Sequence, residues 1–148
     1  MGSTGHFSGE IPTEFAGVPS GVLQLLMQVG YVACGHGAPS LAKVIFEGTA
    51  AVRPNSELPL IGLAFAYIHM GKLTLACDIL ANRAAAINPD NQIVKAVAAM
   101  IFRMSGEFKA SDMLLDEVIA DGTDPQAMEF ARQLKGEDFS YLRRRKFC

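Results

Sequence analysis

The sequence lacks several features that define common classes of protein. It contains no tryptophan, only three cysteines, and no uncharged apolar run of ~18 residues, the length needed to cross a bilayer. A basic segment followed by an apolar core is also missing at the start, so no secretory signal is predicted. Cys34, Cys77 and Cys148 are scattered and have no metal-ligand spacing. We therefore expect free thiols in a reducing compartment, which points to the cytoplasm.

Catalytic and cofactor-binding patterns are missing as well. His6, His36 and His69 are isolated from one another, and each is interpreted as a surface or turn histidine. His36 follows Cys34 by two residues, but a nucleophilic Cys–His pair needs a third orienting group that the neighbouring sequence does not supply. The sequence therefore predicts a protein that is not an enzyme and that binds neither a metal nor a cofactor.

Charge is scarce and unevenly placed. The net charge is −2, all 15 acidic residues lie at or before Asp138, and four basic residues occupy positions 143–146. We interpret this basic tail as a solvated terminus. Contact with an acidic partner or a nucleic acid is the alternative, but no basic helical face accompanies the tail, so we predict no nucleic-acid partner.

Half of the residues are hydrophobic, and they fall into three segments that repeat the same order of helical patterns and turn residues. Each segment has an apolar helical pattern, a turn glycine, a second helical pattern and a proline. The glycines, 34 and 35 residues apart, are Gly37, Gly71 and Gly106, and the prolines are Pro54, Pro89 and Pro125. Such a period predicts three helical hairpins, which must stack because one hairpin cannot bury both its apolar faces.

The second helical pattern of each segment also repeats in residue size. Five positions after the glycine comes a small residue, and four positions further comes a bulky apolar one. The small residues are Ala42, Ala76 and Ser111, and the bulky ones are Phe46, Leu80 and Leu115. We expect the small residues to allow close helix approach and the bulky residues to fill the core.

This periodicity, with a small residue and then an aromatic in the first helix (Ala64 and Tyr67, Ala99 and Phe102), resembles the tetratricopeptide family. The resemblance implies an all-α, tetratricopeptide-like solenoid of three helical hairpins plus a C-terminal capping helix opened by Asp124. We predict a flexible N-terminal arm at 1–19, three repeats and the cap at 20–136, and the basic tail at 137–148.

In this family the first helix of each hairpin lines a concave groove. Carrying the groove positions across in phase gives a mainly apolar set, in which Arg103 is the one basic residue. The predicted partner-binding residues are Met27, Tyr31, Leu58, Ile61, Phe65, Ile68, Ile93, Met100 and Met104. Flexible methionines in an apolar groove suit an amphipathic helix. Alternatively, these residues pack against each other or against Ile11 and Phe15 of the arm.

Size, three repeats, an apolar groove and the segment DPQAMEFARQL at 124–134 resemble the small cytoplasmic chaperones of bacterial type III secretion, in particular the needle-subunit type. The resemblance implies a cytoplasmic bacterial protein that sequesters the amphipathic helix of a self-assembling needle subunit before export. It also implies a second small helical co-chaperone on the outer face.

Two alternatives stay open at this point. One is a translocator-protein chaperone of the same system, which binds an extended peptide. The other is a tetratricopeptide adaptor or scaffold without a chaperone role. An exposed apolar groove also leaves self-association open.

Overall fold

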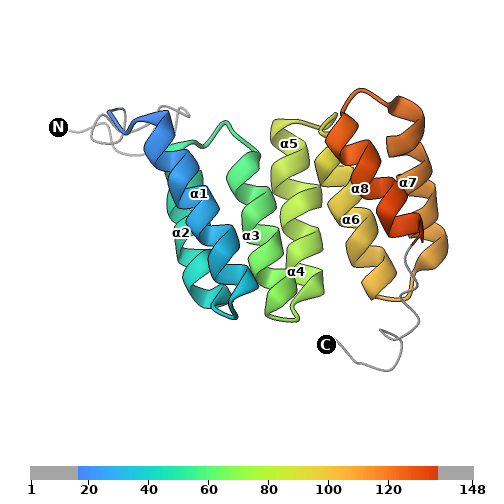
Figure 1. Cartoon of the computed structure of the whole chain (residues 1–148), viewed down its shortest axis with the longest axis horizontal. Helices are drawn as coiled ribbons and strands as arrows, with labels where there is room; N and C mark the ends of the chain where they lie inside the picture. The colour runs from blue at the N-terminus through green and yellow to red at the C-terminus, as the bar shows by residue number, and fades with distance from the viewer. Residues whose placement is uncertain (1–16, 137–148) are drawn as a thin grey trace.

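The computed structural model describes residues 17–136, and Figure 1 shows them as a succession of helices running from α1 at one end to α7 and α8 at the other. Within this range every regular element is helical. The elements are α1 (Ser20–Gly35), α2 (Pro39–Val52), α3 (Leu58–His69), α4 (Leu73–Asp78), the π-helix η1 (Ile79–Ala84), α5 (Ala85–Ile87), α6 (Gln92–Met104), α7 (Phe108–Asp121) and α8 (Pro125–Gly136). Residues 1–16 of the predicted arm and the basic tail lie outside the described residues.

The helices pair as the repeats predict. α1 packs on α2, α3 packs on α4 and η1, and α6 packs on α7, while α2 also contacts α3 and so joins the first hairpin to the second. α8 lies against both α6 and α7, so it covers the end of the stack. The predicted fold class, three hairpins with a C-terminal capping helix, is confirmed.

The three turn glycines adopt the same left-handed conformation, with φ of +78° at Gly37, +74° at Gly71 and +83° at Gly106. In each turn the amide following the glycine donates a 2.8 Å hydrogen bond to a carbonyl five residues earlier. The pairs are Ala38 to Ala33, Lys72 to Tyr67 and Glu107 to Phe102. This closure satisfies carbonyls left open at a helix end, and glycine permits it because it has no Cβ.

The repeated small and bulky positions form the centre of the core. The small residues Ala42, Ala76 and Ser111 are fully buried, as are Phe46 and Leu115, and Leu80 is 1% exposed. The buried residues divide into two clusters, one under α1 to α6 and one among α6, α7 and α8. Ile93, Met100 and Met104 of α6 contact both clusters, so α6 joins the two parts of the solenoid.

Local details differ from the sequence-based expectations. A continuous second helix was expected in the middle hairpin, but a π-helical stretch separates α4 from α5. Asn91 caps α6, because its side-chain oxygen accepts a 3.1 Å bond from the amide of Val94. Pro125 starts α8 instead of closing α7, which ends at Asp121 before a left-handed Gly122.

Candidate binding site

Two aromatic residues from neighbouring hairpins meet on one side of the solenoid. The rings of Tyr31 on α1 and Phe65 on α3 lie edge to face with centroids 6.0 Å apart, and Tyr31 also contacts the buried ring of Phe46 at 5.0 Å. Tyr31 remains 40% exposed and Phe65 is half-buried. Edge-to-face packing holds both rings in place while part of each stays available to a partner.

We use the name inner face for the side that the sequence predicts to bind a partner, represented by Met27, Tyr31, Phe65, Met100 and Met104. The residues come from α1, α3 and α6, the first helices of the three hairpins. All but Tyr31 are half-buried and pack on the core from its edge. Unbranched methionines can change rotamer to fit a bound segment, so the face combines a rigid aromatic centre with an adaptable margin.

The polar groups on this face are few. Partial burial raises the pKa of Tyr31 to about 12, with a further contribution from the neighbouring Cys34, so its hydroxyl stays protonated at neutral pH. The exposed His69 ring donates through Nδ1 to the Phe65 carbonyl at 2.8 Å, which turns it back onto α3. The Tyr31 hydroxyl can therefore serve as a hydrogen-bonding group beside apolar rings.

The prediction that Ile61 and Ile68 contact a partner is corrected by their burial. Ile61 is 4% exposed and Ile68 is 8% exposed, and both belong to the main core cluster. They support the inner face from below and present almost no surface to a partner. The sequence did not reveal this because α3 is apolar on every side, and a helix enclosed by neighbours shows no amphipathic period.

The other predicted residues are distributed as follows. Leu58, at the start of α3, is 56% exposed, and Ile93 of α6 is half-buried between the two clusters. Arg103, expected to face the groove, is 8% exposed and instead joins α6 to α7. Its guanidinium pairs with the Asp112 carboxylate, and its Nε donates to Ser111 Oγ at 3.4 Å. It is thus a structural residue.

The Cys34–His36 pair has none of the properties of a nucleophilic site. Cys34 is buried, and burial raises the pKa of its thiol, whereas a nucleophilic cysteine needs a lowered pKa. His36 is exposed at the C-terminus of α1. Within residues 17–136, no three His, Cys, Asp or Glu side chains are grouped so as to hold a metal ion. No helix in this range has the length and apolarity to cross a membrane.

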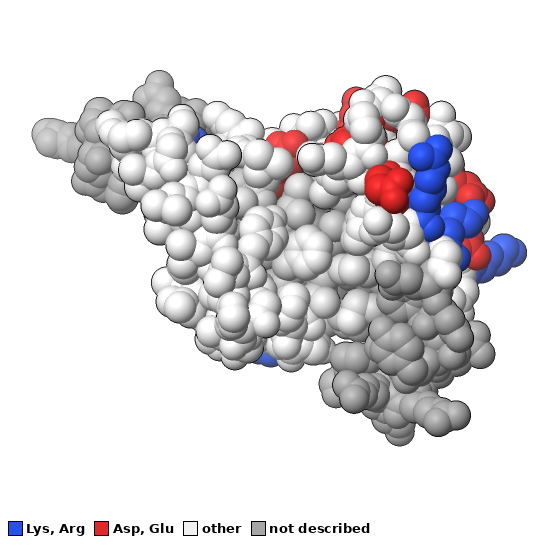
Figure 2. All heavy atoms as spheres, in the orientation of Figure 1, with Lys and Arg blue, Asp and Glu red and all other residues white. Residues whose placement is uncertain are grey.

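A second apolar surface was not predicted from the sequence. Five side chains on α1 and two on α2 are between 39% and 65% exposed, namely Val22, Leu25, Leu26, Val29, Val32, Leu41 and Val44. The sequence does contain a signal for this surface, because no charged residue occurs between Glu14 and Lys43. Figure 2 shows the consequence: charged side chains gather over α7 and α8, and the surface over α1 is almost free of them.

Comparison with known proteins identifies the fold. No family model and no curated protein sequence matches this chain. The translocator chaperone SycD of the type III secretion system of Yersinia enterocolitica superimposes with a TM-score of 0.70 at 18% identity, covering 93% of this chain and 99% of SycD. PcrH, solved with the chaperone-binding region of PopB, gives a TM-score of 0.65 at 16% identity, covering 79% of this chain and 94% of PcrH.

A type III secretion complex from Aeromonas hydrophila matches with a TM-score of 0.67 at 18% identity, covering 85% of this chain and 84% of the matched chain. SycD is described as a translocator chaperone, and PcrH was solved with a chaperone-binding region of another protein. The chain therefore has the tetratricopeptide-like fold seen in these structures, of which SycD is described as a type III secretion translocator chaperone.

Proposed function

We propose that this protein is a cytoplasmic chaperone of a bacterial type III secretion system and that its inner face binds a segment of a secreted translocator protein. The observation that carries the proposal is the pair of the exposed Tyr31 and the half-buried Phe65, held between the first two hairpins of a fold shared with SycD and PcrH. PcrH was solved with the chaperone-binding region of PopB, which supports a peptide ligand for this fold.

The translocator class has more support than the needle-subunit class that the sequence favoured. The needle-subunit interpretation depended on a mainly apolar groove, which has few polar side chains to fix an extended peptide, and on the segment at 124–134. The burial of Ile61 and Ile68 removes two large residues from the apolar stripe that the sequence predicts on α3. An interrupted stripe suits single side chains of an extended peptide better than the continuous apolar stripe of a helix.

Photo-crosslinking in the native cytoplasm tests the proposal. A photoreactive phenylalanine analogue would replace Phe65, and the control would carry it at Met113, which is 61% exposed on α7. We expect position 65, but not position 113, to crosslink a secreted translocator protein, identified by mass spectrometry. Crosslinks to a needle subunit would contradict the translocator proposal and assign the protein to the needle-subunit chaperones instead. Crosslinks only to cytosolic assemblies would favour the adaptor interpretation.

A further inference from the structure

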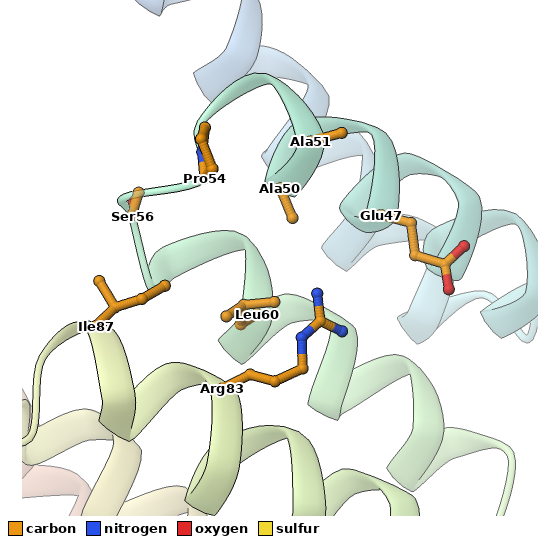
Figure 3. Close-up of a pocket in the computed structure, with 8 residues that line it drawn as sticks. All are labelled: Glu47, Ala50, Ala51, Pro54, Ser56, Leu60, Arg83 and Ile87. Atoms are coloured by element: carbon orange, nitrogen blue, oxygen red, sulfur yellow. The ribbon is translucent and has the colours of Figure 1, made fainter. Parts of the chain in front are cut away.

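A separate pocket of about 390 Å³ lies between the second helices of the first two hairpins. α2 forms one wall, η1 and α5 form the other, and Leu60 of α3 lies at the base (Figure 3). Leu60 precedes Phe65 by five residues, which places the two side chains about 140° apart around α3. The pocket and the inner face therefore lie on different sides of α3, so one partner on each can be bound at the same time.

Arg83 is the distinctive side chain of this pocket. It belongs to the π-helical stretch η1, and Figure 3 shows its side chain extending beside Leu60 towards α2. Arg83 is exposed and has no ion pair or hydrogen bond in the described part of the chain, whereas Arg53 and Arg103 are both engaged. A guanidinium has five N–H donors and binds carboxylates in a bidentate manner, so Arg83 can accept an anionic group.

The rest of the lining determines which anion fits. Ala50, Ala51, Pro54 and Ile87 make the walls largely apolar, and the small alanines leave room for a side chain. Glu47 lines the same pocket, is 49% exposed, and is only 4.0 Å from Lys43. Its carboxylate repels a doubly charged phosphate or a polyanion more strongly than it repels a single carboxylate. One cation beside an apolar cavity instead matches an aliphatic side chain with a single carboxylate next to it.

We propose that the Arg83 pocket binds a segment of a partner protein in which an aliphatic residue is followed directly by Asp or Glu. The aliphatic side chain enters between Ala50 and Ile87, and the carboxylate pairs with the Arg83 guanidinium. This inference does not depend on the function proposed for the inner face. It places the bound segment on a different side of α3 from the inner face.

The probe is a pair of capped dipeptides, acetyl-Leu-Glu-amide and acetyl-Leu-Gln-amide, titrated into the ¹⁵N-labelled full chain and followed by NMR. We expect the Leu-Glu compound to shift the Nε–Hε signal of Arg83 and the amide signals of Ala50 and Ala51. The Leu-Gln compound should bind about tenfold more weakly, because it cannot form a charge-assisted pair. R83Q should reduce Leu-Glu binding to the Leu-Gln level.

The matched control is R132Q, which removes an exposed arginine from α8 and should leave dipeptide binding unchanged. Equal affinity for the two dipeptides, or binding that survives R83Q, would overturn the proposal. A second contrary result is an Arg83 signal that differs between the wild type and E10Q or E14Q when no dipeptide is present. The pocket would then be occupied by the segment of this chain that contains Glu10 or Glu14. An Arg83 signal that shifts with protein concentration alone would identify a second copy as the occupant and would equally reject a separate partner.

Discussion

The ring of Phe46 lies directly against the backbone of Gly62. A Cβ placed on Gly62 would approach three ring carbons of Phe46 more closely than non-bonded atoms can. A Cβ on Gly30 would likewise come 2.6 Å from Cζ of the same ring. Because Phe46 is fully buried, its ring joins α1, α2 and α3 through two glycines and supports Tyr31 on the inner face.

Gly62→Ala should therefore destabilise the protein. The added methyl group overlaps the fully buried Phe46 ring, and overpacking of this kind costs about 1–3 kcal/mol. Urea denaturation followed by circular dichroism measures the change. Gly48→Ala is the matched control, because Gly48 lies in α2 with nothing within 4 Å of an added Cβ. That variant should gain up to about 1 kcal/mol from helix propensity. Equal stability of the two variants would refute the packing argument.

Phe65→Ala should weaken binding of the secreted client without unfolding the chain. Phe65 is half-buried at the centre of the inner face, and truncation of a central aromatic contact costs on the order of 1–3 kcal/mol, or roughly tenfold or more in Kd. Isothermal titration calorimetry with the client captured in the crosslinking experiment gives the affinity. Met113→Ala should bind as the wild type does. An unchanged Kd in folded Phe65→Ala would exclude the inner face as the site.

Arg103→Ala should destabilise the protein more than Asp112→Ala. The Arg103 side chain is 9% exposed and contacts both Ser111 and Asp112, so its removal opens a hole and leaves Ser111 Oγ without its donor. We expect a loss of about 2 kcal/mol or more. Asp112 is 50% exposed, and a solvent-accessible ion pair contributes about 0–1 kcal/mol. The reverse order in thermal or urea unfolding would show that the ion pair dominates.

Glu57 should make stability fall in acid. Its carboxylate accepts hydrogen bonds from Asn91 Nδ2 at 2.7 Å and from Asn88 Nδ2 at 3.0 Å, which tie the start of α3 to the turn before α6. Desolvation alone would raise the pKa of Glu57, but these bonds and one to its own backbone outweigh it, so the pKa is lowered.

Because the folded pKa lies below the unfolded value, the unfolded chain takes up the proton first as the pH falls. The stabilisation is complete above the unfolded pKa, near 4.5, and is lost as the pH falls through the folded value. The stability advantage of the wild type over E57Q should therefore shrink between about pH 5 and pH 3. Asn88→Ala should reduce the same pH dependence, as urea midpoints across this range would show. A constant difference would contradict the assignment.

The sequence alone determined the repeat architecture. Gly37, Gly71 and Gly106 marked turns that need a positive φ, and Ala42 and Phe46, with their counterparts, marked the close contacts and the core. These features are local or periodic, so each is readable from residue type and spacing. The apolar character of the first helices also predicts that their side binds a partner, and this stays a prediction.

The tertiary structure decided which residues are accessible. Ile61 and Phe65 are both apolar residues of α3, yet one is enclosed by neighbouring helices and the other reaches the surface. Arg103 turned inward because Ser111 and Asp112 lie across from it on α7. The Arg83 pocket likewise exists only where α2, η1 and α5 come together. Exposure depends on what packs against each side chain, and that follows from contacts between segments far apart in the sequence.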